Sequence, residues 1–214
     1  MLTRSKKSGL IRTLAAGAAV LGAAFAAGFG SLAEREAPVV GEAAPNFTLT
    51  DINGESHNLA DYQGKVVVLE WFNPDCPFVK KFHYATKVMH ETHADVASSG
   101  EVVFLAINSG APGKQGAGLE RNQQAATEFK IEYPILLDES GEVGRMFGAK
   151  RTPEIFVIDR EGVIQYHGPI DSDPSARKVG ENYLKLAVTQ VVNGESSVIK
   201  SDNAIYGCSV KYAR

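Results

Sequence analysis

The sequence has little cysteine and no surplus of positive charge. Its 214 residues contain two cysteines, Cys76 and Cys208, so one chain can form at most one internal disulfide. Lysine and arginine together number 22, against 25 aspartates and glutamates. A chain of this charge has no basic surplus with which to bind nucleic acid, and it attracts anionic lipid only weakly. We therefore exclude nucleic acid as a partner.

One long uncharged stretch is present, and it lies near the N-terminus. Four basic residues between positions 4 and 12 precede the Ala- and Gly-rich residues 14–29, and small residues follow at 31–33. This order is typical of a secretory signal, although the stretch is also long enough for an uncleaved membrane anchor. No twin-arginine pair is present, which favours Sec-type export to the periplasm or another extracytoplasmic space. Removal of residues 1–33 takes the net charge from -3 to -7.

Motifs for phosphate and for metal are incomplete. Residues 109–118, SGAPGKQGAG, contain Gly-Lys after an apolar run, but a Walker loop needs Gly and Ser or Thr where the chain has Asn108 and Gln115. We interpret this loop as a flexible connection, with a mobile lid beside Cys76 as the alternative. His90 and His93 lack the four-residue step that zinc ligands on one helix prefer. We therefore expect neither a metal nor a cofactor.

The most informative stretch surrounds Cys76. Residues 66–72, VVVLEWF, predict a buried strand, which Asn-Pro-Asp at 73–75 ends. Pro77 suits the first position of a helix, and apolar residues recur near helical spacing as far as Val96. Cys76 is thus expected at a helix N-terminus. Free N–H groups and the helix dipole favour the thiolate there, which is the reactive form of cysteine.

This strand-turn-Cys-Pro-helix stretch resembles the active-site turn of the thioredoxin fold. Residues 73–79, NPDCPFV, are similar to the peroxiredoxin-like redoxins of the AhpC/TSA (alkyl hydroperoxide reductase and thiol-specific antioxidant) group, and the resemblance extends over residues 41–214. The Gly-Cys-Ser-Val-Lys-Tyr ending at 207–212 is similar to the C-terminus of the same redoxins. Two positions depart from these patterns. Val79 stands where thioredoxins have their second CxxC cysteine, and Asn73 stands where typical peroxiredoxins carry Thr or Ser.

The order of apolar and polar segments predicts an α/β fold. Asn53-Gly54 predicts an N-terminal hairpin, and buried strands are expected to alternate with crossover helices until a second hairpin follows Ile158. The resemblance implies a thioredoxin-like fold, with a central mixed sheet flanked by helices and a C-terminal extension. We divide the chain into a signal peptide or anchor, a linker, a redoxin domain and a tail that carries Cys208, at residues 1–33, 34–45, 46–194 and 195–214.

Thr152-Pro153 introduces a predicted buried strand at residues 155–158. An X-Pro step that begins an edge strand is one structural explanation, because proline cannot donate to a strand ladder. In the thioredoxin fold the proline at this place is cis and packs against the nucleophilic turn. The resemblance therefore implies that the Thr152-Pro153 bond is cis and that Pro153 lies beside Cys76.

Three basic or titratable side chains are candidates to influence Cys76. A guanidinium from Arg151 would lower the pKa of a cysteine and polarise a peroxide bond, if the side chain is not simply solvated. Lys80, one helical turn after Cys76, would favour the thiolate by charge unless it is merely exposed. His83 would lie ~10 Å along the helix from Cys76, too far to act as its base.

Two interpretations of the cysteine pair remain open. In the redox interpretation, Cys76 attacks a peroxide or a protein disulfide, Cys208 resolves the intermediate, and an external thiol or thioredoxin-like donor resets the pair. In the structural interpretation, a permanent disulfide that closes a loop of more than 100 residues contributes ~4.7 kcal/mol to stability, and the chain is a non-catalytic binding module. Copper-chaperone relatives of the fold fit less well, because their CxxxC pattern would need cysteine where Lys80 stands. We predict an exported thiol-based oxidoreductase with antioxidant or thiol-disulfide exchange activity.

Overall fold

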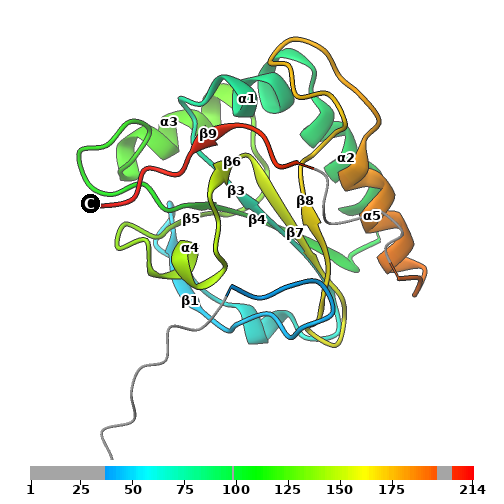
Figure 1. The fold of residues 1–214 in the computed structure, drawn as a ribbon. Coiled ribbons are helices and arrows are strands. Elements are labelled where there is room, and N and C mark those ends of the chain that lie inside the picture. Colours follow the sequence, from blue (N-terminus) through cyan, green and yellow to red (C-terminus); the bar gives the residue numbers. More distant parts are fainter. Residues whose placement is uncertain (1–36, 98, 197–203) are drawn as a thin grey trace, which may run out of the picture. The chain divides into compact units, whose positions relative to one another are not determined.

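The fold is known from a computed structural model, which describes residues 37–97, 99–196 and 204–214 (Figure 1). They form a seven-stranded mixed sheet in the order β2-β1-β5-β4-β3-β7-β8, and β6 pairs with β9 in a second, two-stranded sheet. The strands are β1 (Thr48–Asp51), β2 (Ser56–Asn58), β3 (Val66–Trp71), β4 (Val102–Asn108), β5 (Ile135–Leu137), β6 (Arg151–Thr152), β7 (Glu154–Ile158), β8 (Ile164–Gly168) and β9 (Cys208–Ser209). The α-helices are α1 (Pro77–Lys80), α2 (Val88–Ala97), α3 (Leu119–Phe129), α4 (Glu142–Met146) and α5 (Tyr183–Val192).

Strand β3 lies inside the sheet and is buried along its whole length. It pairs parallel with β4, where Val66 is opposite Val102, and antiparallel with β7, where Val67 is opposite Ile158. Its side chains alternate between two hydrophobic clusters, one on each face of the sheet. This double burial explains why the sequence reads as a continuous apolar run rather than as an alternating pattern.

The two hydrophobic clusters define three layers. On one face of the sheet, the cluster includes side chains of α2, α3 and α5, such as Met89, Phe129 and Leu184. On the other face, Phe147, which follows α4, packs against Trp71 and Phe156. The expected α/β architecture, a central mixed sheet flanked by helices, is therefore confirmed.

The helix expected after Cys76 is interrupted, which the apolar spacing did not indicate. Helix α1 passes directly into a π-helical turn, Lys81–Ala85, whose carbonyl at Lys81 accepts hydrogen bonds from both the amide and the hydroxyl of Thr86. Lys87 then adopts a left-handed backbone, with φ of 58°, before α2 begins. The seven-residue step from Phe82 to Met89 spans this break, so the periodicity survives although the helix does not continue.

The chain between residues 41 and 44 is part of the folded body. Gly41 and Ala44 donate backbone hydrogen bonds to Ile164 and Gly162, and the amide of Ile164 donates to the carbonyl of Glu42. Part of the segment that we expected to be a linker, residues 41–44, therefore packs beside the β7-β8 hairpin. The expected leader lies outside the described residues, and within those residues no helix has the length and apolarity to cross a bilayer.

Candidate active site

Cys76 lies in the turn that follows β3 and precedes α1. Its amide donates a 3.0 Å hydrogen bond to the carbonyl of Asn73, and its own carbonyl accepts one of 3.0 Å from Lys80. The residue occupies the N-cap position with an extended backbone, and Pro77 begins the helix. Its side chain is 2% exposed. The sequence prediction that Cys76 stands at a helix N-terminus is confirmed.

Val79 and Lys80 are adjacent in the sequence, but one side chain is buried and the other is exposed. Val79, at the second position of a CxxC motif, is fully buried in the core. Lys80 is exposed, and the structure assigns its side chain no partner among the described residues. A second thiol at position 79 would thus face the hydrophobic core of this protein.

Residues 109–118, which we interpreted as a flexible connection with a lid beside Cys76 as the alternative, pack on the Cys76 turn. The side-chain amide of Asn73 donates to the carbonyl of Gln115 at 3.0 Å, and its oxygen accepts from the amide of Asp75 at 2.9 Å. A Cβ added at Gly116 would clash with this same Asn73 side chain. Arg121 of α3 also pairs with the Asp75 carboxylate at 2.8 Å. Asn73, which replaces the usual Thr or Ser, therefore ties this loop to the turn that carries Cys76.

Cys208 reaches Cys76 through the pairing of β6 with β9. In this antiparallel pair Thr152 is opposite Cys208 and Arg151 is opposite Ser209. The two sulfur atoms lie 2.8 Å apart, and the Cys76 sulfur is also 3.0 Å from the carbonyl oxygen of Thr152. Both cysteines are free thiols in the structure. Two residues separated by 132 positions in the sequence are thus brought into contact.

The surroundings of Cys208 disfavour its thiolate. Burial, the hydrogen bond with Cys76 and the charge of Cys76 raise the pKa of Cys208 to about 12, while Lys211 and Arg151 oppose this rise. Arg151 is exposed, so it acts on the Cys208 pKa from the surface. Cys208 is therefore a protonated thiol near neutral pH and a poor leaving group.

Glu154 stabilises the segment that carries Thr152 through hydrogen bonds. The sequence did not lead us to single out Glu154. The Thr152-Pro153 bond is cis, as the resemblance implied. The next residue, Glu154, is 1% exposed, and its carboxylate accepts 2.7 Å hydrogen bonds from the amides of Lys150 and Arg151. Its other oxygen pairs with His167 at 2.7 Å. A charged residue at the start of an otherwise apolar run was the available signal for this role.

His83 pairs with the buried carboxylate of Glu70. Its Nε2 lies 2.8 Å from Glu70, whose second oxygen accepts a hydrogen bond from Tyr133. Burial and the Glu70 charge raise the pKa of Tyr133 well above its usual value, so Tyr133 remains a donor. The ring of His83 packs against Phe129. Over the described residues, no three His, Cys, Asp or Glu side chains are grouped so that they could hold a metal ion.

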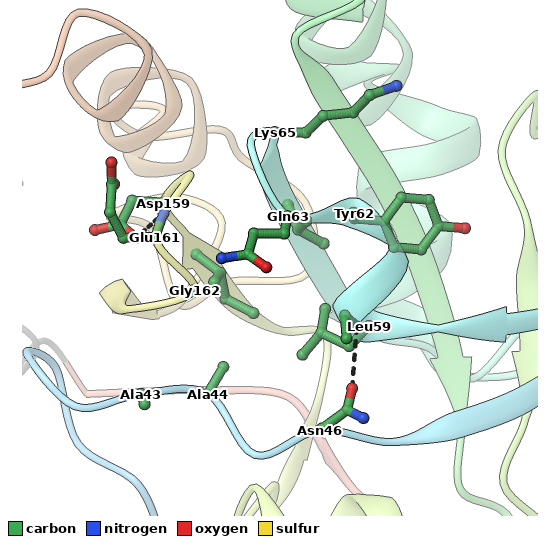
Figure 2. A pocket seen from close by; sticks show the side chains of 13 residues that line it. Ala43, Ala44, Asn46, Leu59, Tyr62, Gln63, Lys65, Asp159, Glu161 and Gly162 are labelled. Carbon is green, nitrogen blue, oxygen red and sulfur yellow. Dashed lines mark hydrogen bonds between the residues drawn. The ribbon is translucent and has the colours of Figure 1, made fainter.

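A pocket of 220 Å³ lies near the opposite end of β3 from Cys76. Figure 2 shows its lining side chains, which include Tyr62, Gln63 and Lys65. The amide of Ala60 donates a 3.0 Å hydrogen bond to Asn46 at its border. Since the pocket adjoins the beginning of β3 and Cys76 follows its end, the pocket is separate from the sulfur pair.

Comparison with known proteins decides the family. The sequence matches the AhpC/TSA family over residues 40–167. The chain belongs to the AhpC/TSA family. Thiol-disulfide oxidoreductase ResA of Geobacillus thermodenitrificans is 32% identical over 133 residues, which cover 62% of this chain and 70% of ResA. This AhpC/TSA protein is accordingly a thiol-based oxidoreductase.

Solved structures agree with the fold. A hypothetical protein from Sinorhizobium meliloti 1021 superimposes with a TM-score of 0.70 at 27% identity and covers 83% of this chain and 97% of its own. The thioredoxin domain of a thiol-disulfide oxidoreductase from Bacteroides vulgatus gives a TM-score of 0.50 at 22% identity, with 60% and 86% of the two chains covered. The fold of this AhpC/TSA protein is thus thioredoxin-like.

Gly207 allows β9 to approach β6, so its replacement should separate the sulfurs. Gly207 has φ of 135°, and a Cβ at this position would clash with the Thr152 carbonyl oxygen. We expect Gly207→Ala to slow Cys76–Cys208 disulfide formation about tenfold and to cost ~1–3 kcal/mol of stability through backbone strain. Quenched-flow thiol alkylation with mass mapping measures the rate.

Gly194→Ala is the matched control for Gly207→Ala. Gly194 also has a positive φ, of 76°, but a Cβ there would contact nothing within 4 Å. Gly194→Ala should therefore lose stability through backbone strain without slowing Cys76–Cys208 disulfide formation. Equal rates of disulfide formation in both variants would contradict the role assigned to Gly207.

Proposed function

We propose that this protein catalyses thiol-disulfide exchange with Cys76 as its nucleophile and Cys208 as its resolving cysteine. The observation that carries the proposal is the 2.8 Å separation of the two sulfur atoms, with Cys76 at a helix N-terminus. The similarity to ResA, which is named for this activity, supports the same reaction class.

The proposed cycle has three steps. The Cys76 thiolate attacks one sulfur of a substrate disulfide, forms a mixed disulfide and releases the other substrate sulfur as a thiolate. Cys208 loses its proton to solvent and attacks the Cys76 sulfur, which releases the second substrate thiolate and leaves a Cys76–Cys208 disulfide. An external dithiol donor, such as a thioredoxin-like protein, then reduces this disulfide and becomes oxidised itself. Two electrons pass from the donor to the substrate in each cycle.

The arrangement of the site suggests supporting roles for its other residues. Pro77 begins helix α1 directly after Cys76, and the carbonyl oxygen of Thr152, the residue before Pro153, lies 3.0 Å from the Cys76 sulfur. Arg151 lowers the Cys208 pKa against the effect of burial, which eases the second step. Lys80 is exposed, so any effect on the Cys76 thiolate would act through solvent.

A second candidate substrate is a hydroperoxide. Cys76 is 2% exposed beneath the C-terminal segment, and a small molecule reaches such a sulfur more readily than a protein disulfide does. The Cys76 thiolate would attack one peroxide oxygen and release an alcohol or water, giving a sulfenic acid. Cys208 would then close the disulfide and release water.

Export is part of the proposal and rests on the sequence. The basic residues, apolar stretch and small-residue exit of residues 1–33 fit a secretory leader, with the redoxin domain at 46–194 and the cysteine-bearing tail at 195–214. We place the enzyme in the periplasm or another extracytoplasmic space, either free or held by an uncleaved leader. A reducing donor must then be supplied in that compartment.

The test is a time-resolved thiol map of the reduced full-length protein. Separate samples receive one equivalent of glutathione disulfide or of hydrogen peroxide, and peptides are mapped by mass spectrometry after alkylation. We expect loss of both thiols and a Cys76–Cys208 cross-linked peptide, and the faster oxidant identifies the substrate class. If neither oxidant forms this link, or if dithiothreitol cannot reduce it in the folded protein, the enzyme proposal is wrong. A Cys76–Cys208 link that dithiothreitol cannot reduce would favour the structural-disulfide interpretation.

A further inference from the structure

A buried ion pair involves Lys81, the residue that directly follows helix α1. The side chains of Lys81 and Asp171 are both inaccessible to solvent, and Lys81 Nζ lies 3.2 Å from a carboxylate oxygen of Asp171. Lys81 also donates a 3.0 Å hydrogen bond to the carbonyl of Asp173. The amides of Asp173 and Gly180 donate to the same Asp171 carboxylate at 3.1 and 2.9 Å. The Asp171 carboxylate, in the loop after β8, therefore has both a counter-charge and backbone hydrogen-bond donors.

Tyr206 connects this ion pair to the segment that carries Cys208. Its hydroxyl contacts the Asp171 carboxylate, and it lies 3.3 Å from the Asp171 carbonyl oxygen. Burial and the neighbouring carboxylate raise the pKa of Tyr206 far above its usual value, so the hydroxyl stays protonated and donates. Its ring packs against Phe78, with centroids 5.7 Å apart.

The positions of these residues in the sequence link the cluster to the sulfurs. Phe78 and Tyr206 each lie two positions from a cysteine, the first after Cys76 and the second before Cys208. The β6-β9 pairing itself extends over only two residue pairs. Such a short pairing leaves the N-terminal side of Cys208 dependent on other contacts, and Tyr206 supplies them.

We propose that Tyr206 is a positioning residue that, through its contact with the Lys81–Asp171 pair, holds Cys208 against Cys76. This inference deepens the proposed function and rests on Cys208 being the resolving cysteine. Fixing the segment on the N-terminal side of Cys208 raises the effective concentration of its thiol at the Cys76 sulfur. Loss of the Tyr206 hydroxyl should therefore weaken disulfide closure while leaving the chemistry of Cys76 intact.

The experiment compares Tyr206→Phe with Tyr212→Phe in the full-length protein. Tyr206→Phe removes the hydroxyl and keeps the ring on Phe78. Tyr212→Phe removes a hydroxyl from the same segment, one that donates to the neutral carbonyl of Ala149 at 2.8 Å. The equilibrium constant for the Cys76–Cys208 disulfide is measured in glutathione redox buffers. We expect about a tenfold loss for Tyr206→Phe, because its partner is charged, and less than about a threefold loss for Tyr212→Phe.

A second measurement separates positioning from general damage. In the Cys208→Ser background, adding Tyr206→Phe should change the rate of Cys76 mixed-disulfide formation with glutathione disulfide less than about twofold. The positioning role is wrong if the wild type closes the disulfide and Tyr206→Phe closes it equally well, or if both tyrosine variants lose the same amount. If the wild type itself forms no Cys76–Cys208 disulfide, the proposed function fails and the positioning role falls with it.

Discussion

Replacement of Cys76 by serine is expected to lower thiol-dependent turnover by at least ~1,000-fold. The hydroxyl of serine is not ionised near neutral pH, so the group that attacks the substrate disulfide is lost. The substitution is nearly isosteric at a side chain that is 2% exposed, so the fold should persist. The measurement is the rate of glutathione disulfide or hydrogen peroxide consumption with an excess of dithiol, together with a thermal unfolding curve of each reduced protein.

Cys208→Ser is the informative companion of Cys76→Ser. If Cys208 resolves the intermediate, this variant should react once at Cys76 and then stop as a mixed disulfide or a sulfenic acid, which mass spectrometry identifies. Cys76→Ser should accumulate neither species. Full activity in both variants would contradict the redox assignment. Equal losses of stability in both, with no thiol-dependent activity in the wild type, would favour a structural disulfide instead.

Lys81→Met is expected to destabilise the reduced protein by ~3–5 kcal/mol. Lys81 and Asp171 are completely buried, and their charges compensate each other at 3.2 Å. Removal of the ammonium leaves the Asp171 carboxylate with backbone and hydroxyl donors but without a counter-charge in a region of low dielectric constant. Urea denaturation of the reduced variant and wild type measures the difference in unfolding free energy.

An exposed ion pair provides the control for Lys81→Met. Lys185 and Asp95 are 2.6 Å apart, but their side chains are 52% and 50% exposed. Solvent screens this pair, so Lys185→Met should cost less than ~1 kcal/mol. The double variant Lys81→Met/Asp171→Asn should regain part of the stability lost in Lys81→Met, because no unpaired charge remains buried. If Lys81→Met costs no more than Lys185→Met, the Lys81–Asp171 pair does not support the fold as described.

Adjacent residues show why the site was only partly predictable. Lys80 and Lys81 are chemically identical in the sequence, and only Lys80 was singled out as a candidate. In the structure Lys80 is exposed, whereas the Lys81 side chain is buried against Asp171. Neighbouring residues on a helix point in directions about 100° apart, so one of two consecutive lysines can face the interior. Which one does so depends on a partner 90 positions away.

The sequence alone determined the local structure around Cys76. The apolar run of β3, the Asn-Pro-Asp break and Pro77 fixed a strand, a turn and a helix start, because each depends on neighbours a few residues apart. The Asn53-Gly54 hairpin, α3 and α5 were predictable for the same reason. The interruption between α1 and α2 was not predictable, since there the Lys81 carbonyl accepts hydrogen bonds from both the amide and the hydroxyl of Thr86.

Tertiary structure alone decided which groups surround the sulfur of Cys76. The meeting of Cys208 with Cys76 depends on the two-residue pairing of β6 with β9, and that pairing depends on Gly207, Glu154 and Tyr206. The two cysteines stand 132 positions apart, and local propensity carries no information about contacts over such a distance. The sequence therefore determined that one cysteine lies in the turn after a buried strand, whereas packing of the C-terminal segment decided that a second thiol lies beside it.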